Sequence, residues 1–219
     1  MWLDAGTGTF AALGERTDPA GVDALVLTHV HGDHCLDFFP LFNLLRYGGG
    51  RERPLPVFAP EGVAARLAGF AGAGPGHDLF RVFEFVEVAP GDEVEVGGLW
   101  MGFGEAMHSV PTVAVRVGDG GAVLAYTADT GPGDGPAAAA AGADLLLAEA
   151  TYQGRRVEGG YPYHLYAAEA GALAERSGSG RLVVTHVAPT LDPAASVDEA
   201  AAVFSGQVVW AAPGMEVQV

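Results

Sequence analysis

The sequence contains no lysine and only one cysteine, Cys35, so it cannot form an internal disulfide. We expect Cys35 to be a small apolar residue rather than a metal ligand or a reactive thiol. No run of about 18 apolar residues is present, and a membrane-spanning helix is therefore not expected. The N-terminus has neither the basic nor the apolar region of a signal peptide, which favours a cytoplasmic protein.

Positive charge is also scarce. The formal net charge is −16, and all eleven basic residues are arginines. A protein that grips many phosphates normally carries a basic stripe. Here only Arg46, Arg51 and Arg53 approach a basic cluster, and Glu52 lies among them. Extended binding of nucleic acid is therefore disfavoured, although a bound metal would add positive charge that this count omits.

Short apolar runs alternate with helical patterns along all 219 residues, which predicts an α/β fold. No linker or change of composition divides the chain, so we expect a single domain from residue 1 to residue 219. The expected strands are 22–28, 55–59, 80–88, 92–96, 99–106, 113–117, 122–127, 145–148, 182–185 and 208–211. The expected helices are 10–16, 36–47, 62–70, 136–141, 165–176 and 193–204.

The most informative segment is Thr28-His29-Val30-His31-Gly32-Asp33-His34, which directly follows an apolar run. Three imidazoles and one carboxylate lie within six residues, at the end of an expected strand. Imidazole and carboxylate are ligands of zinc and similar metals. The segment therefore predicts a metal that makes a bound water nucleophilic near neutral pH.

Three further strand ends carry residues of the same types. His108 follows the strand 99–106, Asp129 follows the strand 122–127, and His186 follows the strand 182–185. Any one of them alone is better explained as a structural hydrogen-bonding residue. Taken together with the first cluster, they indicate one metal centre built from four strand ends.

The order His-x-His-x-Asp-His, then His, Asp and His, resembles the metallo-β-lactamase superfamily of metal-dependent hydrolases. The resemblance covers nearly the whole chain, from Leu3-Asp4-Ala5-Gly6 to Gly214-Met215. It implies a four-layer αβ/βα sandwich with a dinuclear metal site. The family usually has about two more strands before the first turn. The domain is therefore expected to be short at its N-terminus and to lack the first strands, which would expose a sheet edge suited to a homodimer.

The resemblance also implies a ligand set for two divalent metal ions. Zinc is the first choice, and manganese or iron also suit nitrogen and oxygen ligands. The first ion would be held by His29, His31 and His108, the second by Asp33, His34 and His186, and Asp129 would bridge both. Zinc β-lactamases carry a cysteine near the position of Asp129. The carboxylate here instead favours hydrolysis of phosphate or carboxylic esters. The nucleophile would be a hydroxide between the metals.

Two more segments resemble ribonuclease Z-like proteins. They are Glu149-Ala150-Thr151 and Tyr163-His164-Leu165. By resemblance, Glu149 would orient His164, and His164 would act as the general acid that protonates the leaving oxygen. Asp33 is counted with these two residues as catalytic. The alternative is a helix-terminal histidine and a core-edge glutamate with structural roles.

The chain looks like the short relatives of ribonuclease Z that lack the tRNA-clamping arm. Only 71–76 could correspond to that arm, and it is far too short. The predicted function is therefore hydrolysis of a small or short phosphodiester, with extended tRNA binding disfavoured and no membrane partner. One alternative is a lactonase or a carboxylic or sulfate ester hydrolase on the same metals. A non-catalytic metal-binding or redox protein is the alternative from another class.

Overall fold

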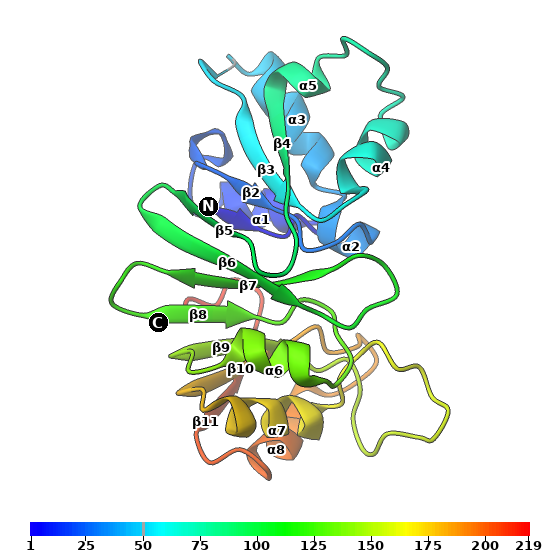
Figure 1. Cartoon of the computed structure of the whole chain (residues 1–219), viewed down its shortest axis with the longest axis vertical. Helices are drawn as coiled ribbons and strands as arrows, with labels where there is room; N and C mark the ends of the chain where they lie inside the picture. Colours follow the sequence, from blue (N-terminus) through cyan, green and yellow to red (C-terminus); the bar gives the residue numbers. More distant parts are fainter. Residues whose placement is uncertain (50) are drawn as a thin grey trace. The chain divides into compact units, whose positions relative to one another are not determined.

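The structure is a computed structural model that describes residues 1–49 and 51–219. The chain divides into two compact units, Met1–Ala89 and Pro90–Val219, and each contains one sheet with its own helices (Figure 1). The α/β class is confirmed. Each unit consists of one sheet and its helices, which is what one half of the expected sandwich contains. That the two units act as one domain stays a prediction. None of the helices within the described ranges is long and apolar enough to cross a membrane.

The first unit contains a four-stranded parallel sheet in the order β1-β2-β3-β4, with β1 at one edge. Its register aligns Trp2 with Leu25, and Leu25 with Val57. The strands are β1 (Trp2–Leu3), β2 (Leu25–Val26), β3 (Leu55–Ala59) and β4 (Phe83–Glu87). The helices are α1 (Thr9–Gly14), the 3-10 turn η1 (Pro19–Gly21), α2 (Gly32–Cys35), α3 (Phe38–Tyr47), α4 (Val63–Phe70) and α5 (Leu79–Val82).

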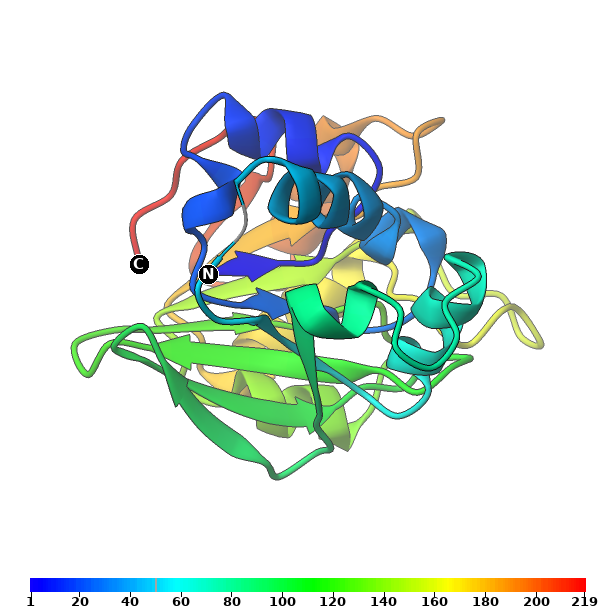
Figure 2. The same ribbon diagram turned by 90° about the horizontal axis from the view of Figure 1, so that it is seen from above.

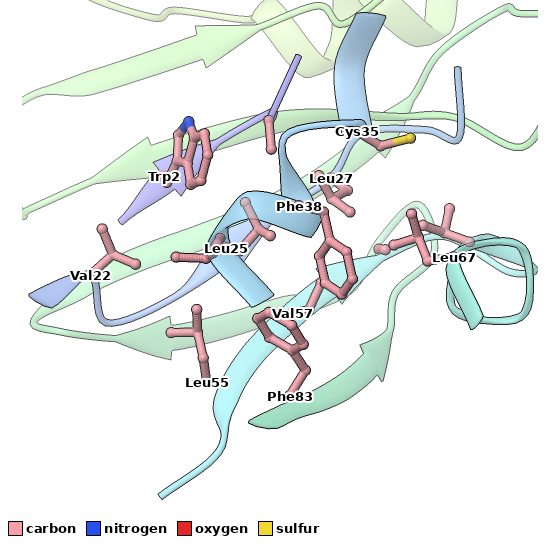
Figure 3. Packing of buried hydrophobic residues seen from close by; sticks show 14 of the residues in the cluster. Trp2, Val22, Leu25, Leu27, Cys35, Phe38, Leu55, Val57, Leu67 and Phe83 are labelled. Atoms are coloured by element: carbon pink, nitrogen blue, oxygen red, sulfur yellow. The ribbon is translucent and has the colours of Figure 1, made fainter. Parts of the chain in front are cut away.

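The core of the first unit lies between this sheet and helix α3, which lies beside α1 over the strands (Figure 2). Phe38 at the start of α3 is fully buried, and its ring centroid lies 4.3 Å from that of Phe83 on β4. Figure 3 shows Phe38 directed toward Phe83, with Leu27 close beside it. Because α3 begins immediately after the histidine segment, this packing also fixes where that segment leaves the sheet.

Replacing Phe38 with alanine should lower the free energy of unfolding by about 3–5 kcal/mol, the usual cost of deleting a buried aromatic ring. Phe70, at the end of α4, is 73% exposed and offers a matched control. Its replacement with alanine should cost no more than about 0.5 kcal/mol. Urea unfolding followed by circular dichroism measures both values. Equal losses in the two variants would contradict this description of the core.

Two expected strands are partly wrong, and in the first of them, 22–28, only Leu25–Val26 forms a strand. The prediction of a strand over 80–88 fails at its start, where residues 79–82 form the short helix α5. Leu79 is buried and Val82 is half-buried, whereas Phe80 and Arg81 between them are exposed, which is helical rather than strand spacing. The ring of His77 also accepts a hydrogen bond from the Leu79 amide through Nδ1, at 3.1 Å. The chain therefore becomes a strand only at Phe83.

The second unit contains a seven-stranded mixed sheet in the order β11-β10-β9-β8-β7-β6-β5. Its strands are β5 (Glu93–Val96), β6 (Leu99–Glu105), β7 (Val113–Gly118), β8 (Val123–Tyr126), β9 (Leu145–Glu149), β10 (Arg181–Thr185) and β11 (Gln207–Trp210). The helices α6 (Asp134–Ala140), α7 (Ala167–Ser177) and α8 (Pro193–Ala201) gather on one side of this sheet (Figure 1). Gly171 permits the close approach of α7 and α8, because a Cβ there would lie 2.3 Å from the Ala200 carbonyl oxygen.

Strand directions in the second unit bring several chain segments to one edge. Strands β8, β9 and β10 are parallel neighbours, and β6 runs the same way because β7 is antiparallel to both β6 and β8. The carboxyl ends of these four strands therefore meet at the same edge of the sheet. The residues that follow them are the ones that carry the predicted metal chemistry.

Candidate metal centre

The histidine segment of the first unit leaves the carboxyl end of β2 and enters the short helix α2. Its four polar residues, His29, His31, Asp33 and His34, are called the His29 cluster below. His29 and His34 are buried, with ring centroids 4.1 Å apart. The Asp33 side chain is 65% exposed, and its Oδ2 lies 3.8 Å from Nε2 of His34. The short helix thus presents a carboxylate and an imidazole side by side.

Asp4, directly after β1, holds this cluster through hydrogen bonds to Thr28 and His34. Its Oδ1 accepts a hydrogen bond from the Thr28 amide at 2.7 Å, and its Oδ2 accepts one from the Thr28 hydroxyl at 2.8 Å. The same Oδ2 lies 2.8 Å from Nδ1 of His34. A carboxylate only accepts, so Nδ1 of His34 is the donor and Nε2 carries the lone pair.

The tautomer of His29 follows in the same way, from which partner of each hydrogen bond carries the proton. The Thr28 hydroxyl has one proton, which it donates to Asp4, so its oxygen accepts from Nδ1 of His29 at 3.1 Å. Nε2 of His29 then carries the lone pair, 3.1 Å from Nδ1 of His31. Two imidazole nitrogens on a tetrahedral zinc ion are about 3.3 Å apart. This pair is therefore spaced as two ligands of one ion.

The glycine turn Ala5-Gly6 packs against the His29 cluster. Ala5 donates its amide to the His34 carbonyl at 2.7 Å and accepts from the Asp37 amide at 2.8 Å. A Cβ on Gly6 would lie 1.9 Å from the Asp33 carbonyl oxygen. Only glycine permits this approach, so the turn supports the histidine segment.

Cys35 behaves as the sequence predicts. It is 3% exposed, and its Sγ donates a weak hydrogen bond to the Val30 carbonyl at 3.4 Å. Burial raises the pKa of the Cys35 thiol to about 11, and the negative charges of Asp4 and Asp33 act in the same direction. A neutral buried thiol is neither a reactive nucleophile nor a ready ligand.

In the second unit, His108, Asp129, His164 and His186 gather at the shared carboxyl edge of β6, β8, β9 and β10, and are called the Asp129 cluster below. Oδ2 of Asp129 lies 3.5 Å from Nε2 of His186 and 4.0 Å from Nε2 of His108. It lies 3.9 Å from Nδ1 of His164. Asp129, His164 and His186 each offer one ligand atom within 4.8 Å of the others, which is compact enough for a metal ion.

Each of these imidazoles is oriented through Nδ1. His108 donates Nδ1 to the Tyr163 carbonyl oxygen, at 3.1 Å. The Thr151 hydroxyl donates its proton to Oε2 of Glu149 at 2.7 Å, so it accepts from Nδ1 of His186 at 2.9 Å. In both histidines the lone pair is therefore on Nε2, which faces Asp129. Outer hydrogen bonds of this kind are typical of histidines that bind metals.

Glu149, at the end of β9, is fully buried and contacts His164 directly. Its Oε1 lies 2.8 Å from Nδ1 of His164 and also accepts from the Thr130 amide at 2.8 Å. The ring centroids of Tyr152 and Tyr161 lie 6.0 and 5.7 Å from that of His164. His164 is thus held through Nδ1 by a carboxylate and bordered by aromatic rings. Its other nitrogen, Nε2, is not used in the contact with Glu149.

Backbone strain coincides with both clusters. Three non-glycine residues in the described ranges have positive φ, namely Asp4, Ala128 and His186, each at 54°. Non-glycine residues rarely adopt this conformation, and strain of this kind gathers at functional sites. Here Asp4 hydrogen-bonds to the His29 cluster, His186 belongs to the Asp129 cluster, and Ala128 directly precedes Asp129.

An arginine clamp fixes the loop that carries His164. Nε and Nη2 of Arg156 donate to the two carboxylate oxygens of Glu169 at 2.7 and 2.6 Å, in a bidentate pair. Arg156 also donates to the His164 carbonyl at 2.6 Å and to the Tyr161 carbonyl at 3.2 Å. Glu169 lies in the first turn of α7, so the clamp ties the loop to a helix of the unit.

Replacing Arg156 with alanine should therefore displace His164 and lower turnover by about tenfold to a hundredfold, since a shift of about 1 Å can cost that much. Bound metal should remain, because Arg156 contacts none of the predicted ligands. Arg155→Ala removes an exposed charge from the neighbouring position and should leave turnover unchanged. Steady-state kinetics with metal analysis tests this, and unchanged turnover in Arg156→Ala would rule out the clamp's role.

The structure brings together all predicted site residues of each unit. The first unit unites His29, His31, Asp33 and His34, and the second unites His108, Asp129, Glu149, His164 and His186. Sequence reasoning missed the residues that orient them, which are Asp4, Thr28, Thr151, Arg156 and the Tyr163 carbonyl. The only available signals were adjacency, since Thr28 precedes His29 and Thr151 follows Glu149 by two positions.

The donor sets of both units fit divalent metal ions. Imidazole nitrogens with assigned lone pairs and carboxylate oxygens suit zinc, manganese or iron. Carbonyl-rich cages, which calcium prefers, are not part of either cluster. A divalent metal is therefore the group that these residues are best suited to hold.

Comparisons with known proteins agree with this chemistry. Residues 2–187 match a family model described as a beta-lactamase superfamily domain. An uncharacterised protein of Mycobacterium tuberculosis, Rv1339, is 32% identical over 210 residues, which is 94% of this chain and 76% of that protein. A ribonuclease Z of Mycobacterium bovis is 29% identical over 239 residues, covering 94% of this chain and 83% of that enzyme.

A solved structure is similar over almost the whole chain. It is the metallo-beta-lactamase fold protein YhfI of Bacillus subtilis, with a TM-score of 0.85 and 26% sequence identity. The match covers 97% of this chain and 84% of YhfI. The fold is thus that of a known architecture, the metallo-beta-lactamase fold.

Proposed function

The chain belongs to the metallo-β-lactamase superfamily, and from that premise we propose that this hydrolase is a phosphodiesterase of the ribonuclease Z-like type, acting on small or short substrates. The observation that carries the proposal is the Glu149–His164 contact of 2.8 Å beside Asp129 and His186. It places an imidazole that can hold a proton next to a cluster suited to a metal. This pairing is what cleavage of an ester with a poor leaving group requires.

The proposed cofactor is a pair of divalent metal ions, with zinc preferred and manganese or iron as substitutes. The His29 cluster and the Asp129 cluster would supply one ligand set within a single domain, 1–219. His29, His31 and His108 would hold one ion, and Asp33, His34 and His186 the other, with Asp129 shared. When bound, such ions activate a water molecule and stabilise negative charge on the ester.

His164 would serve as the general acid. Its Nδ1 donates to Glu149, so the ring is an imidazolium whenever Nε2 also carries a proton. Nε2 would pass this proton to the leaving oxygen. Glu149 is held by the Thr130 amide and the Thr151 hydroxyl, so it keeps its position throughout.

The acidic balance of the chain argues for a small substrate. A net charge of −16 disfavours long phosphate backbones, and the segment between α4 and α5, residues 71–78, is too short for a tRNA-clamping arm. A cytoplasmic location, the absence of a membrane partner and a possible homodimer belong to the same proposal. None of them alters the chemistry at the two clusters.

A hydrolysis panel tests the proposal. The purified protein, supplied in turn with Zn²⁺ and Mn²⁺, is assayed with bis-p-nitrophenyl phosphate, cyclic nucleotides, lactones and aryl sulfates. The expected result is metal-dependent turnover of the phosphodiesters well above that of the other esters. Strong turnover of lactones or aryl esters without phosphodiester turnover would instead make the protein a carboxylic or sulfate ester hydrolase.

A further inference from the structure

A cavity of about 290 Å³ in the first unit is lined by four of the chain's eleven basic residues. Arg46 comes from the end of α3, Arg51 and Arg53 from the segment before β3, and Arg81 from α5. Asp78 is the carboxylate on its lining. In a chain with a net charge of −16, this is a marked local concentration of positive charge.

The cavity lies away from the His29 cluster within the same unit. The sheet is parallel, and the His29 cluster follows the carboxyl end of β2. Arg53 instead precedes the amino end of β3, and Arg81 precedes the amino end of β4. Because the strands run in one direction, the arginines lie at the amino ends of the strands and the histidines lie at the carboxyl ends.

Two of the arginines are fixed by hydrogen bonds that leave other donors for a ligand. Nη1 of Arg51 donates to the Ala20 and Val22 carbonyls at 2.6 and 2.8 Å. Nε of Arg46 donates to Oδ2 of Asp78 at 2.6 Å, a contact that does not use its two Nη groups. Prepositioned guanidinium groups of this kind are well suited to phosphate oxygens.

The charge on the cavity indicates the size of the anion. Four arginines and one carboxylate line the cavity. The hydrogen bond from Arg46 keeps the pKa of Asp78 below its usual value, so that carboxylate is charged near pH 7. A single phosphate would leave positive charge uncompensated, whereas a diphosphate would balance it. The cavity volume also admits a compact group of this size.

We propose that this arginine cavity binds a diphosphate group, either as inorganic pyrophosphate or as the phosphate chain of a nucleotide. The site is separate from the proposed hydrolytic centre and does not depend on it. Its bound anion would cross-link the end of α3, the segment before β3, and α5. The consequence would be a rigid amino edge of the first unit when the anion is present.

Titration calorimetry with inorganic pyrophosphate at low salt tests the proposal. Arg81→Glu should weaken binding by about tenfold or more, since it removes a charge-assisted hydrogen bond and adds repulsion. Arg66→Glu makes the same charge change on the exposed face of α4 and should alter the dissociation constant less than about twofold. Asp78→Asn should tighten binding, because it removes the carboxylate that repels the anion.

Two further arms locate the site and define the ligand. The double variant His29→Ala, His31→Ala should still bind pyrophosphate, whereas loss of binding there would assign the anion to the candidate metal centre and overturn the proposal. So would equal weakening by Arg81→Glu and Arg66→Glu, or wild-type binding no tighter than that of sulfate. A parallel titration with ATP decides the source, because a nucleotide site binds ATP more tightly than pyrophosphate.

Discussion

Replacing His164 with alanine should lower turnover of bis-p-nitrophenyl phosphate by about 10²- to 10⁴-fold, the usual contribution of a positioned general acid. The physical reason is the 2.8 Å contact with Glu149, which orients the ring through Nδ1. Bound metal should stay the same, since the proposed ligands are other side chains. Steady-state kinetics and metal analysis on the same preparation measure both quantities.

The substrate itself provides a control for this variant. A diester whose leaving group is a weak base, such as p-nitrophenolate, needs less protonation than an alkyl ester, so the loss should be larger for a cyclic nucleotide. Tyr161→Phe keeps the ring beside His164 and should have little effect. If His164→Ala loses metal, His164 is a ligand or a structural residue and the assigned role is wrong.

Replacing Asp129 with alanine should reduce turnover to the level of a blank and remove at least one metal equivalent. The side chain of Asp129 is 3% exposed, and its Oδ2 lies 3.5 Å from His186 Nε2 and 4.0 Å from His108 Nε2. In the proposed centre this carboxylate would be shared by two ions, so its loss should weaken both sites. Elemental analysis after gel filtration, together with the hydrolysis assay, tests this.

Asp134→Ala is the matched control for Asp129→Ala. Asp134 lies at the start of α6 in the same unit and is exposed, so its loss should leave both metal content and turnover unchanged. Full retention of metal by Asp129→Ala would show that this residue is not a ligand. The bridging assignment would then have to be abandoned.

The positions of the candidate residues in the fold could be predicted from the sequence, because residues that directly follow buried strands leave a local signature. An apolar run followed by His or Asp is readable without a structure, and the structure places His108, Asp129 and His186 after β6, β8 and β10 as expected. Strand β3, Leu55–Ala59, also matches its predicted range. Local patterns were sufficient wherever burial and spacing agreed.

The orienting residues could not be predicted in this way. Asp4 meets His34 across 30 positions, and Thr151 meets His186 across 35. No spacing rule links such distant residues, since their contact depends on how strands are paired. The role of Arg156 could not be predicted either. It donates hydrogen bonds to the His164 carbonyl and to Glu169, and these groups come together only in the folded loop.

Helix α5 was missed for a different reason. The run Leu79-Phe80-Arg81-Val82-Phe83 is apolar enough for either a strand or a helix, and short runs are ambiguous on periodicity alone. The hydrogen bond from the Leu79 amide to Nδ1 of His77 decides in favour of the helix. That decision also places Arg81 on the cavity, so a local error in the sequence interpretation concealed the arginine cluster's fourth member.

The most direct test of the central claim is the metal content of the purified protein, measured by inductively coupled plasma mass spectrometry against protein concentration. We predict two equivalents of divalent metal per chain after reconstitution with Zn²⁺, and loss of hydrolysis when a chelator removes them. A chain that binds no metal, or that hydrolyses phosphodiesters equally well without it, would contradict the account.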